Sequence, residues 1–195
     1  MNEKKPLSLM IIILTIATFC SYHIYYYVID KANDSLVRNY NKGNTLDETS
    51  DVKVEKIEAE GKEEYFAILE IPKINLTQGF YNINSNKNNV NAHVTMLKES
   101  SMPNTNGSVI YLAAHSGTGY IAYFKNIDKL SIDDVINIKY QNKTYSYSIN
   151  DIYEMPKNGT ITVNHNIHEN YLVLTTCSKN KNMQLVITSK LISKI

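Results

Sequence analysis

Residues 171–177 read YLVLTTC, and residues 109–114 read VIYLAA. Both stretches are apolar without the alternation of a strand that has one face in water, which is typical of central strands buried on both faces. The first stretch ends at Cys177, and His115 follows the second. The two stretches therefore predict the centre of a β-sheet, with a reactive side chain at the end of each strand.

Further short runs surround these two and are separated by clusters of Asn, Gly, Asp and Pro. They are YFAILEI (65–71), GFYNI (79–83), DVINIKY (134–140), KTYSYSINDIYEM (143–155), GTITV (159–163) and QLVITSKLI (184–192). The segment YQNKTY (140–145) predicts a hairpin. Amphipathic helical periodicity is absent from residues 65–195, apart from single turns near 88–97 and 121–126. The pattern predicts a mostly β fold class: one closed or nearly closed β-barrel of about eight strands, with short helices.

The length and composition of the chain exclude several classes of protein. A chain of 195 residues suits one domain of about 150 residues plus appendages. Its 43% apolar and 20% charged residues and its net charge of +1 exclude a disordered chain and a strongly basic nucleic-acid binder. Arg38 is the only arginine among 20 basic residues, so residues 65–195 contain none.

An apolar segment near the N-terminus predicts a membrane anchor. Residues 7–29 contain no Asp, Glu, Lys or Arg across 23 positions, enough to cross a hydrocarbon core of about 30 Å as a helix. Lys4 and Lys5 precede the segment and predict a cytoplasmic N-terminus. No small-residue cleavage pattern follows it, which favours an uncleaved signal anchor over a cleaved signal peptide.

The anchor divides the chain into four expected regions. Residues 1–6 form a cytoplasmic N-terminus, 7–29 a single transmembrane helix, 30–64 a polar stalk and 65–195 an extracellular barrel. The stalk carries ten acidic and six basic residues and predicts a flexible coil, with a short helix over 51–64 as an alternative. The expected location is the cell membrane, with the lipid bilayer as a partner.

Cys177 and His115 together suggest chemistry that neither suggests alone. Cys177 is the only cysteine of residues 65–195, so it has no disulfide partner there and could equally be a buried, inert thiol. His115 alone could be a structural histidine. A thiol and an imidazole at two strand ends are the parts needed for covalent acyl transfer, in which a thiolate attacks a carbonyl and the leaving amine is protonated.

The residues around this pair resemble a known family. Residues 173–177, VLTTC, resemble the TLxTC signature of the sortases of Gram-positive bacteria, with Val173 in place of the first Thr. Residues 113–117, AAHSG, are similar to the segment around the sortase histidine, and residues 69–74, LEIPKI, resemble the first-strand motif. The resemblance covers residues 65–195, and the anchor and stalk match the family's usual layout.

The resemblance implies a sortase-like barrel and a cysteine transpeptidase. In such enzymes the cysteine attacks the threonyl carbonyl of an LPxTG-like sorting motif, forms a thioacyl-enzyme and passes the protein to an amine of a cell-wall precursor or a pilin. Cys177 is then the nucleophile and His115 the general acid/base. Thr176 is a candidate for placing the substrate or its oxyanion, or is simply a β-former in its strand.

One family position is substituted. Sortases carry an arginine on the strand after the cysteine, and Gln184 stands there in this chain. An amide donates hydrogen bonds but is neutral, so it lacks charge assistance. Lys179 and Lys181, in the segment SKNKNM, are candidates for a point charge beside the substrate.

Other functions have less support in the sequence. A metal site is not expected at His165 and His168, because no Cys or acidic cluster accompanies them. No cofactor is expected. One alternative is an L,D-transpeptidase or another cysteine peptidase of the cell wall, but this chain lacks their SxGCxR-type motif. The other alternative is a catalytically silent, membrane-tethered barrel that binds sorting peptides. The sorting motif, the amine acceptor and the sortase class are left open.

Overall fold

A computed structural model of the chain describes residues 5–45, 64–163 and 168–195. The chain divides into two compact units, Met1–Ser35 and Leu36–Ile195. The second unit contains all of the described strands.

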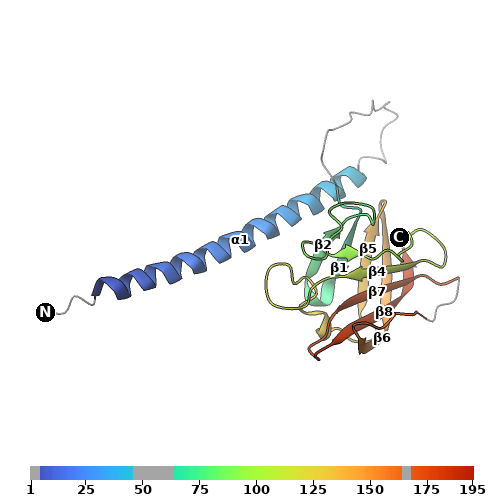
Figure 1. Ribbon diagram of the computed structural model, residues 1–195. Coiled ribbons are helices and arrows are strands. Elements are labelled where there is room, and N and C mark those ends of the chain that lie inside the picture. The colour runs from blue at the N-terminus through green and yellow to red at the C-terminus, as the bar shows by residue number, and fades with distance from the viewer. Residues whose placement is uncertain (1–4, 46–63, 164–167) are drawn as a thin grey trace. The chain divides into compact units, whose positions relative to one another are not determined.

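The second unit is built on one eight-stranded sheet (Figure 1). Its strands are β1 (Ala67–Ile71), β2 (Leu76–Phe80), β3 (Thr95–Met96), β4 (Val109–Ala113), β5 (Val135–Tyr140), β6 (Lys143–Pro156), β7 (Tyr171–Cys177) and β8 (Met183–Lys194). Two 3₁₀ turns, η2 (Pro72–Ile74) and η3 (Ile127–Lys129), accompany them. The order across the sheet is β2-β1-β5-β6-β8-β7-β4-β3.

The two edges of the sheet, at β2 and β3, come together. A parallel bridge joins Phe80, the last residue of β2, to Val94, just before β3. The sheet therefore curls into a nearly closed barrel, as the sequence predicts. Its interior holds fully buried side chains from every part of the sheet, including Leu69, Leu112 and Tyr147.

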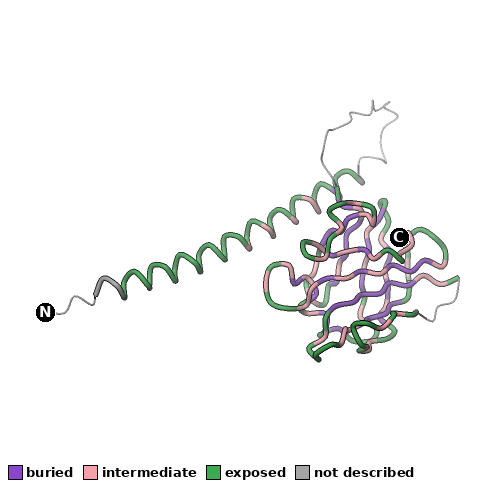
Figure 2. Tube along the Cα trace, viewed as in Figure 1, coloured by how far each residue is buried: buried purple, intermediate pink, exposed green. Residues whose placement is uncertain are grey.

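Strands β4 and β7 are neighbours in the sheet, and each has a further strand on its other side, β3 beside β4 and β8 beside β7. They run parallel, with Val109 opposite Tyr171 and Ala113 opposite Thr175. Figure 2 shows long buried stretches along the barrel strands. In β7 all residues except Cys177 are buried, which confirms the prediction from YLVLTTC.

Both faces of β7 are covered, by different groups of side chains. Leu172 and Leu174 pack into the barrel interior. Val173 packs on the outer face with Val186 of β8, in a cluster that includes Met155 of β6. Residues Ile161 and Val163, from the connection between β6 and β7, also pack against this outer cluster. This cover explains why β7 shows no alternation of apolar and polar residues.

Two strand predictions differ from the structure. The run 159–163, GTITV, is not a strand; it forms the connection whose apolar side chains cover the outer cluster. A short strand, β3, lies instead at Thr95–Met96, inside a region where the sequence suggests only a single helical turn. The predicted hairpin at 140–145 is confirmed, because Gln141 and Asn142 adopt positive φ values of 48° and 60° between β5 and β6. That geometry is expected of a two-residue turn.

The N-terminal helix α1 (Lys5–Thr45) is longer than the predicted anchor. It contains an apolar stretch with a mean hydropathy of 1.7, long enough to cross a membrane. The coil expected from residue 30 is wrong as far as Thr45, because the helix continues through this polar sequence. The alternative helix over 51–64 falls almost entirely outside the described residues.

The last turns of α1 belong to the second unit and have apolar contacts there. Leu36, Val37 and Tyr40 pack with Tyr65, Ile68 and Tyr81. The Tyr40 hydroxyl also donates to the carbonyl oxygen of Lys139 in β5, at 3.1 Å. This packing explains why the helix persists where the sequence becomes polar, since tertiary contacts supply most of the stability of a helix.

Candidate active site

The parallel pairing of β4 and β7 brings two strand ends to the same edge of the barrel. Ala113 pairs with Thr175 at the last position of the ladder. His115 and Cys177 each lie two residues further along their own chains. The end of β7 and the segment that follows β4 therefore lie next to each other.

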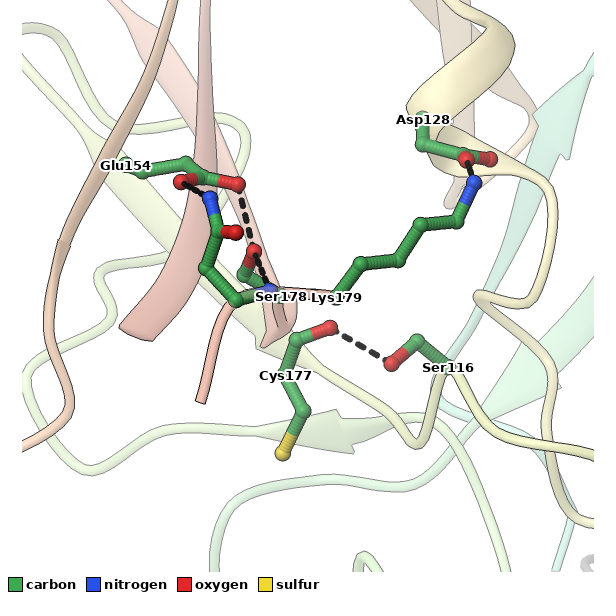
Figure 3. Close-up of polar contacts among 7 residues, drawn as sticks. Ser116, Asp128, Glu154, Cys177, Ser178 and Lys179 are labelled. Atoms are coloured by element: carbon green, nitrogen blue, oxygen red, sulfur yellow. Dashed lines mark hydrogen bonds and ion pairs between the residues drawn. The ribbon is translucent and has the colours of Figure 1, made fainter. Parts of the chain in front are cut away.

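Three hydrogen bonds join these two segments. The Ala114 amide donates to the Thr175 carbonyl oxygen at 3.4 Å, and the Thr176 hydroxyl donates to the Ala114 carbonyl oxygen at 2.6 Å. The Ser116 hydroxyl donates to the Cys177 carbonyl oxygen at 2.6 Å (Figure 3). Ala114 and Ser116, on either side of His115, are therefore hydrogen-bonded to residues 175–177.

Side-chain alternation sets the direction of the thiol. Successive side chains of a strand point to opposite faces, so Cys177 shares the outer face with Val173, and Thr176 shares the inner face with Leu174. Cys177 is exposed, whereas Thr176 is only 7% exposed. The thiol is accessible from the outer face of the barrel.

Gln184 lies beside Cys177 on this face. The two residues are direct partners in the antiparallel β7–β8 ladder. The Gln184 side-chain oxygen accepts a hydrogen bond from the Thr175 hydroxyl at 3.2 Å, and its Nε2 donates to the Pro156 carbonyl oxygen at 3.2 Å. The amide is held in one orientation, and one of its two N–H groups is still available to a ligand.

The loop from β7 to β8 is fixed by polar contacts with β6 (Figure 3). The Glu154 carboxylate accepts hydrogen bonds from the Ser178 hydroxyl and from the Asn180 amide. These hydrogen bonds lower the pKa of Glu154 below its usual range. Glu154 is therefore an anion at neutral pH, bonded to two neutral donors.

Lys179 and Lys181 lie in the same loop and differ in their contacts. Lys179 forms an ion pair with Asp128, just after the start of η3. The hydrogen bond from Lys179 is the main cause that lowers the pKa of Asp128. Lys181 is exposed. Of the two candidate point charges, Lys179 is thus already engaged by a carboxylate.

A pocket of about 420 Å³ opens at this end of the barrel. Apolar side chains of Phe124, Ile127, Ile152 and Leu185 line it, together with the charged groups of Asp128, Glu154 and Lys179. In Figure 3 the Cys177 thiol points away from Glu154 and Lys179. Cys177 and its neighbours Thr176 and Ser178 also line the pocket, so the pocket adjoins the candidate nucleophile.

The imidazole of His115 has one hydrogen-bond partner on a distant part of the chain. Its Nε2 lies 3.3 Å from Oδ1 of Asn91, in the connection between β2 and β3. Among the described residues, no group of three or more His, Cys, Asp or Glu side chains is arranged to hold a metal ion. His165 lies outside the described residues.

A family model described as the Sortase domain matches residues 69–192. The chain belongs to the sortase family. The matched residues include His115, Cys177 and Gln184, and they cover well over half of the chain. No curated protein sequence matches it.

Solved sortase structures share the fold. A sortase D5 transpeptidase from Clostridium perfringens is 23% identical with a TM-score of 0.60, covering 85% of this chain and 99% of that chain. A lid mutant of sortase A from Corynebacterium diphtheriae is 17% identical with a TM-score of 0.61, covering 84% and 95%. Sortase C from Streptococcus pneumoniae is 19% identical with a TM-score of 0.60, covering 91% and 97%. At these identities the likeness establishes the sortase barrel and nothing finer.

Three contributors to the site were not foreseen from the sequence of this sortase. Ser116 lies in the AAHSG motif, which gives a local signal. Glu154 and Asn91 lie 23 and 24 residues from Cys177 and His115, respectively, in polar segments of ordinary composition. No local pattern distinguishes these two, because their proximity to the site is created by the pairing of β6 with β8 and of β3 with β4.

Proposed function

We propose that this sortase is a membrane-anchored cysteine transpeptidase, with Cys177 as nucleophile and His115 as general acid/base. The observation that carries the proposal is the parallel β4–β7 pairing, which tethers the histidine segment to the cysteine segment at one barrel edge. Family membership supports the same class of activity.

The proposed reaction has two covalent steps. Cys177 loses its proton to His115, and the thiolate attacks the threonyl carbonyl of an LPxTG-like sorting motif. The tetrahedral intermediate collapses to a thioester as the peptide C–N bond breaks, and the imidazolium gives its proton to the leaving amine. An amine of a cell-wall precursor or a pilin then attacks the thioester, forms a new amide and releases the thiol.

Gln184 is the proposed oxyanion donor. It lies directly opposite Cys177, and its bonds to Thr175 and Pro156 hold the amide in place before substrate arrives. Preorganised donors of this kind stabilise the charge that develops on the carbonyl oxygen. Thr176 contributes through its bond to Ala114, which fixes the segment leading to His115.

We also propose that α1 anchors the protein in the cell membrane with the N-terminus in the cytoplasm. The apolar stretch supports the anchor, and Lys4 and Lys5 at its N-terminal side support this orientation. The barrel is then extracellular, where sorting-signal proteins and wall amines are found.

Trapping of the thioacyl-enzyme tests the proposed activity. The full chain in detergent or nanodiscs is incubated with a panel of LPxTG-like peptides, and its intact mass is measured. We expect a thioester adduct on the natural chain and on Cys20→Ser, and none on Cys177→Ala. A folded natural chain that binds these peptides without forming any adduct contradicts the proposal and supports a silent binding barrel.

A further inference from the structure

We propose that Asn91 is a positioning residue for His115: its side-chain amide selects the tautomer of the imidazole and fixes the plane of the ring. The inference rests on the proposed acid/base role of His115. It assigns a task to a residue outside the segments that resemble sortase motifs.

The contact determines which ring nitrogen carries hydrogen. Oδ1 of Asn91 lies 3.3 Å from Nε2 of His115, and an amide oxygen can only accept a hydrogen bond. With the Asn91 amide in this orientation, Nε2 carries the hydrogen, and in the neutral ring Nδ1 is left with its lone pair. Nδ1 is then the nitrogen that exchanges protons with the thiol and the leaving amine.

The same bond serves every stage of the proposed cycle. The neutral tautomer and the imidazolium both carry hydrogen on Nε2, so the bond to Asn91 persists while Nδ1 gains and loses its proton. An amide also adds no net charge beside the ring. Asn91 can thus hold the ring without opposing the return of the proton.

Asn91 is itself held by its own segment. Its backbone N–H donates to the side-chain oxygen of Asn89 at 2.9 Å. The backbone N–H groups of Ala92 and His93 donate to the Asn89 carbonyl oxygen at 3.0 and 2.9 Å. Asn89 therefore orders the turn that presents Asn91.

Asn88 joins this turn to the sheet. Its side-chain amide donates to the Met96 carbonyl oxygen at 2.8 Å, and its side-chain oxygen accepts from the Met96 N–H at 2.9 Å. Met96 pairs with Leu112 in the β3–β4 ladder. The turn is therefore fixed to the strand that leads to His115.

A second connection comes from the segment after His115. The Tyr123 hydroxyl donates to the carbonyl oxygen of Ala92 at 3.2 Å, and the Phe124 N–H donates to the carbonyl oxygen of His115 at 2.9 Å. Adjacent residues 123 and 124 thus hydrogen-bond to the neighbour of Asn91 and to His115 itself. A contact supported from two sides is suited to orienting a ring.

Kinetics of three variants of the full chain test the inference, with an LPxTG-like peptide that forms the thioacyl-enzyme. Asn91→Ala should lower kcat about tenfold, the worth of one good hydrogen bond, with little change in KM. Asn91→Asp keeps the acceptor and should recover most of kcat. It should also move the limb of the pH–rate profile that reports the imidazole to higher pH, because a carboxylate favours the protonated ring. Asn84→Ala is the matched control, since Asn84 is an exposed residue of the same connection, and it should leave kcat unchanged.

A measurement without substrate separates this inference from the proposed function. Nitrogen NMR of histidine-labelled protein, with the signal assigned through His115→Gln, should show one tautomer with hydrogen on Nε2 in the natural chain and a mixture in Asn91→Ala. An unchanged tautomer in Asn91→Ala overturns the inference, whether or not kcat falls. A correct tautomer in a chain that no peptide acylates overturns the proposed function and, with it, the catalytic use of Asn91.

Discussion

Gln184 is the residue at which this chain differs most consequentially from the sortase pattern. It lies opposite Cys177, and its amide contacts both Thr175 and the carbonyl oxygen of Pro156. A neutral amide offers one remaining N–H where an arginine offers a charged fork. The geometry supports an oxyanion donor, and the missing charge implies slower acylation than an arginine permits.

Substitution at position 184 tests this role. Gln184→Ala should reduce the rate of thioacyl-enzyme formation by about 10²–10³, the usual cost of losing an oxyanion donor. Gln184→Arg should increase it, because a charged donor forms stronger hydrogen bonds to the oxyanion and can still donate to Pro156. Rapid quenching and intact-mass measurement give the rates.

Lys181→Ala is the matched control, because Lys181 is an exposed cation in the adjoining loop. It should leave the rate of acylation within about twofold, as surface substitutions usually have little effect. If Lys181→Ala slows acylation and Gln184→Ala does not, the lysine and not the amide is the donor.

At the scale of elements, the loop between β7 and β8 depends on one carboxylate of β6. Glu154 accepts from Ser178 and Asn180, and the Ser178 hydroxyl in turn accepts from the Asn180 backbone N–H at 2.9 Å. Ser178 directly follows Cys177. The conformation of the loop beside Cys177 is therefore linked to the charge of Glu154.

This link predicts an acid transition of the loop. The pKa of Glu154 is lowered in the folded protein, first by the hydrogen bond from Ser178 and then by the one from Asn180. The stabilising contribution of the carboxylate is thus complete above the ordinary glutamate pKa of about 4.3 and is lost as the pH falls through the lower folded value. The Asn180 side-chain NMR signals should report this loss below about pH 4.

Two neutralising variants distinguish a local effect from general acid unfolding. Glu154→Gln should remove the transition at Asn180, because no carboxylate is left to titrate. Glu169→Gln is the control, since Glu169 also has a lowered pKa but bonds to Lys190 and Tyr171. An Asn180 transition that survives in Glu154→Gln contradicts the link.

At the scale of the whole molecule, the chain combines an apolar helix with a sortase barrel. The apolar stretch of α1 is exposed along its length, and the barrel carries an exposed cysteine. A membrane enzyme with its barrel outside the cell presents that thiol to the medium. A barrel on the cytoplasmic side presents it to the cell interior.

Thiol labelling of intact cells tests the orientation. In a Cys20→Ser background, a membrane-impermeant maleimide should label Cys177 without permeabilisation, because the thiol is exposed. The double variant Cys20→Ser/Cys177→Ser should give no signal. Labelling that appears only after permeabilisation places the barrel in the cytoplasm and contradicts the proposed topology.

The sequence by itself determined the class of fold, the strands β4 and β7, and Cys177 and His115 as candidate catalytic residues. The runs VIYLAA and YLVLTTC are long and apolar, and the burial on both faces that this composition predicts is complete in β7 up to Thr176 and partial in β4, where Tyr111 and Ala113 are half-buried. His115 and Cys177 stand within local motifs that can be recognised without knowing the fold. The apolar length of residues 7–29 likewise determined a candidate anchor.

Only the tertiary structure decided the features that depend on contacts distant in sequence. The run GTITV has the composition of a strand, but its apolar side chains cover the outer face of β7. The helix continues to Thr45 because Tyr40 and its neighbours pack against barrel residues. Asn91 reaches His115 through the β3–β4 pairing. Local composition sets what a segment can form, whereas the choice among these outcomes comes from packing and hydrogen bonds that exist only after the chain has folded.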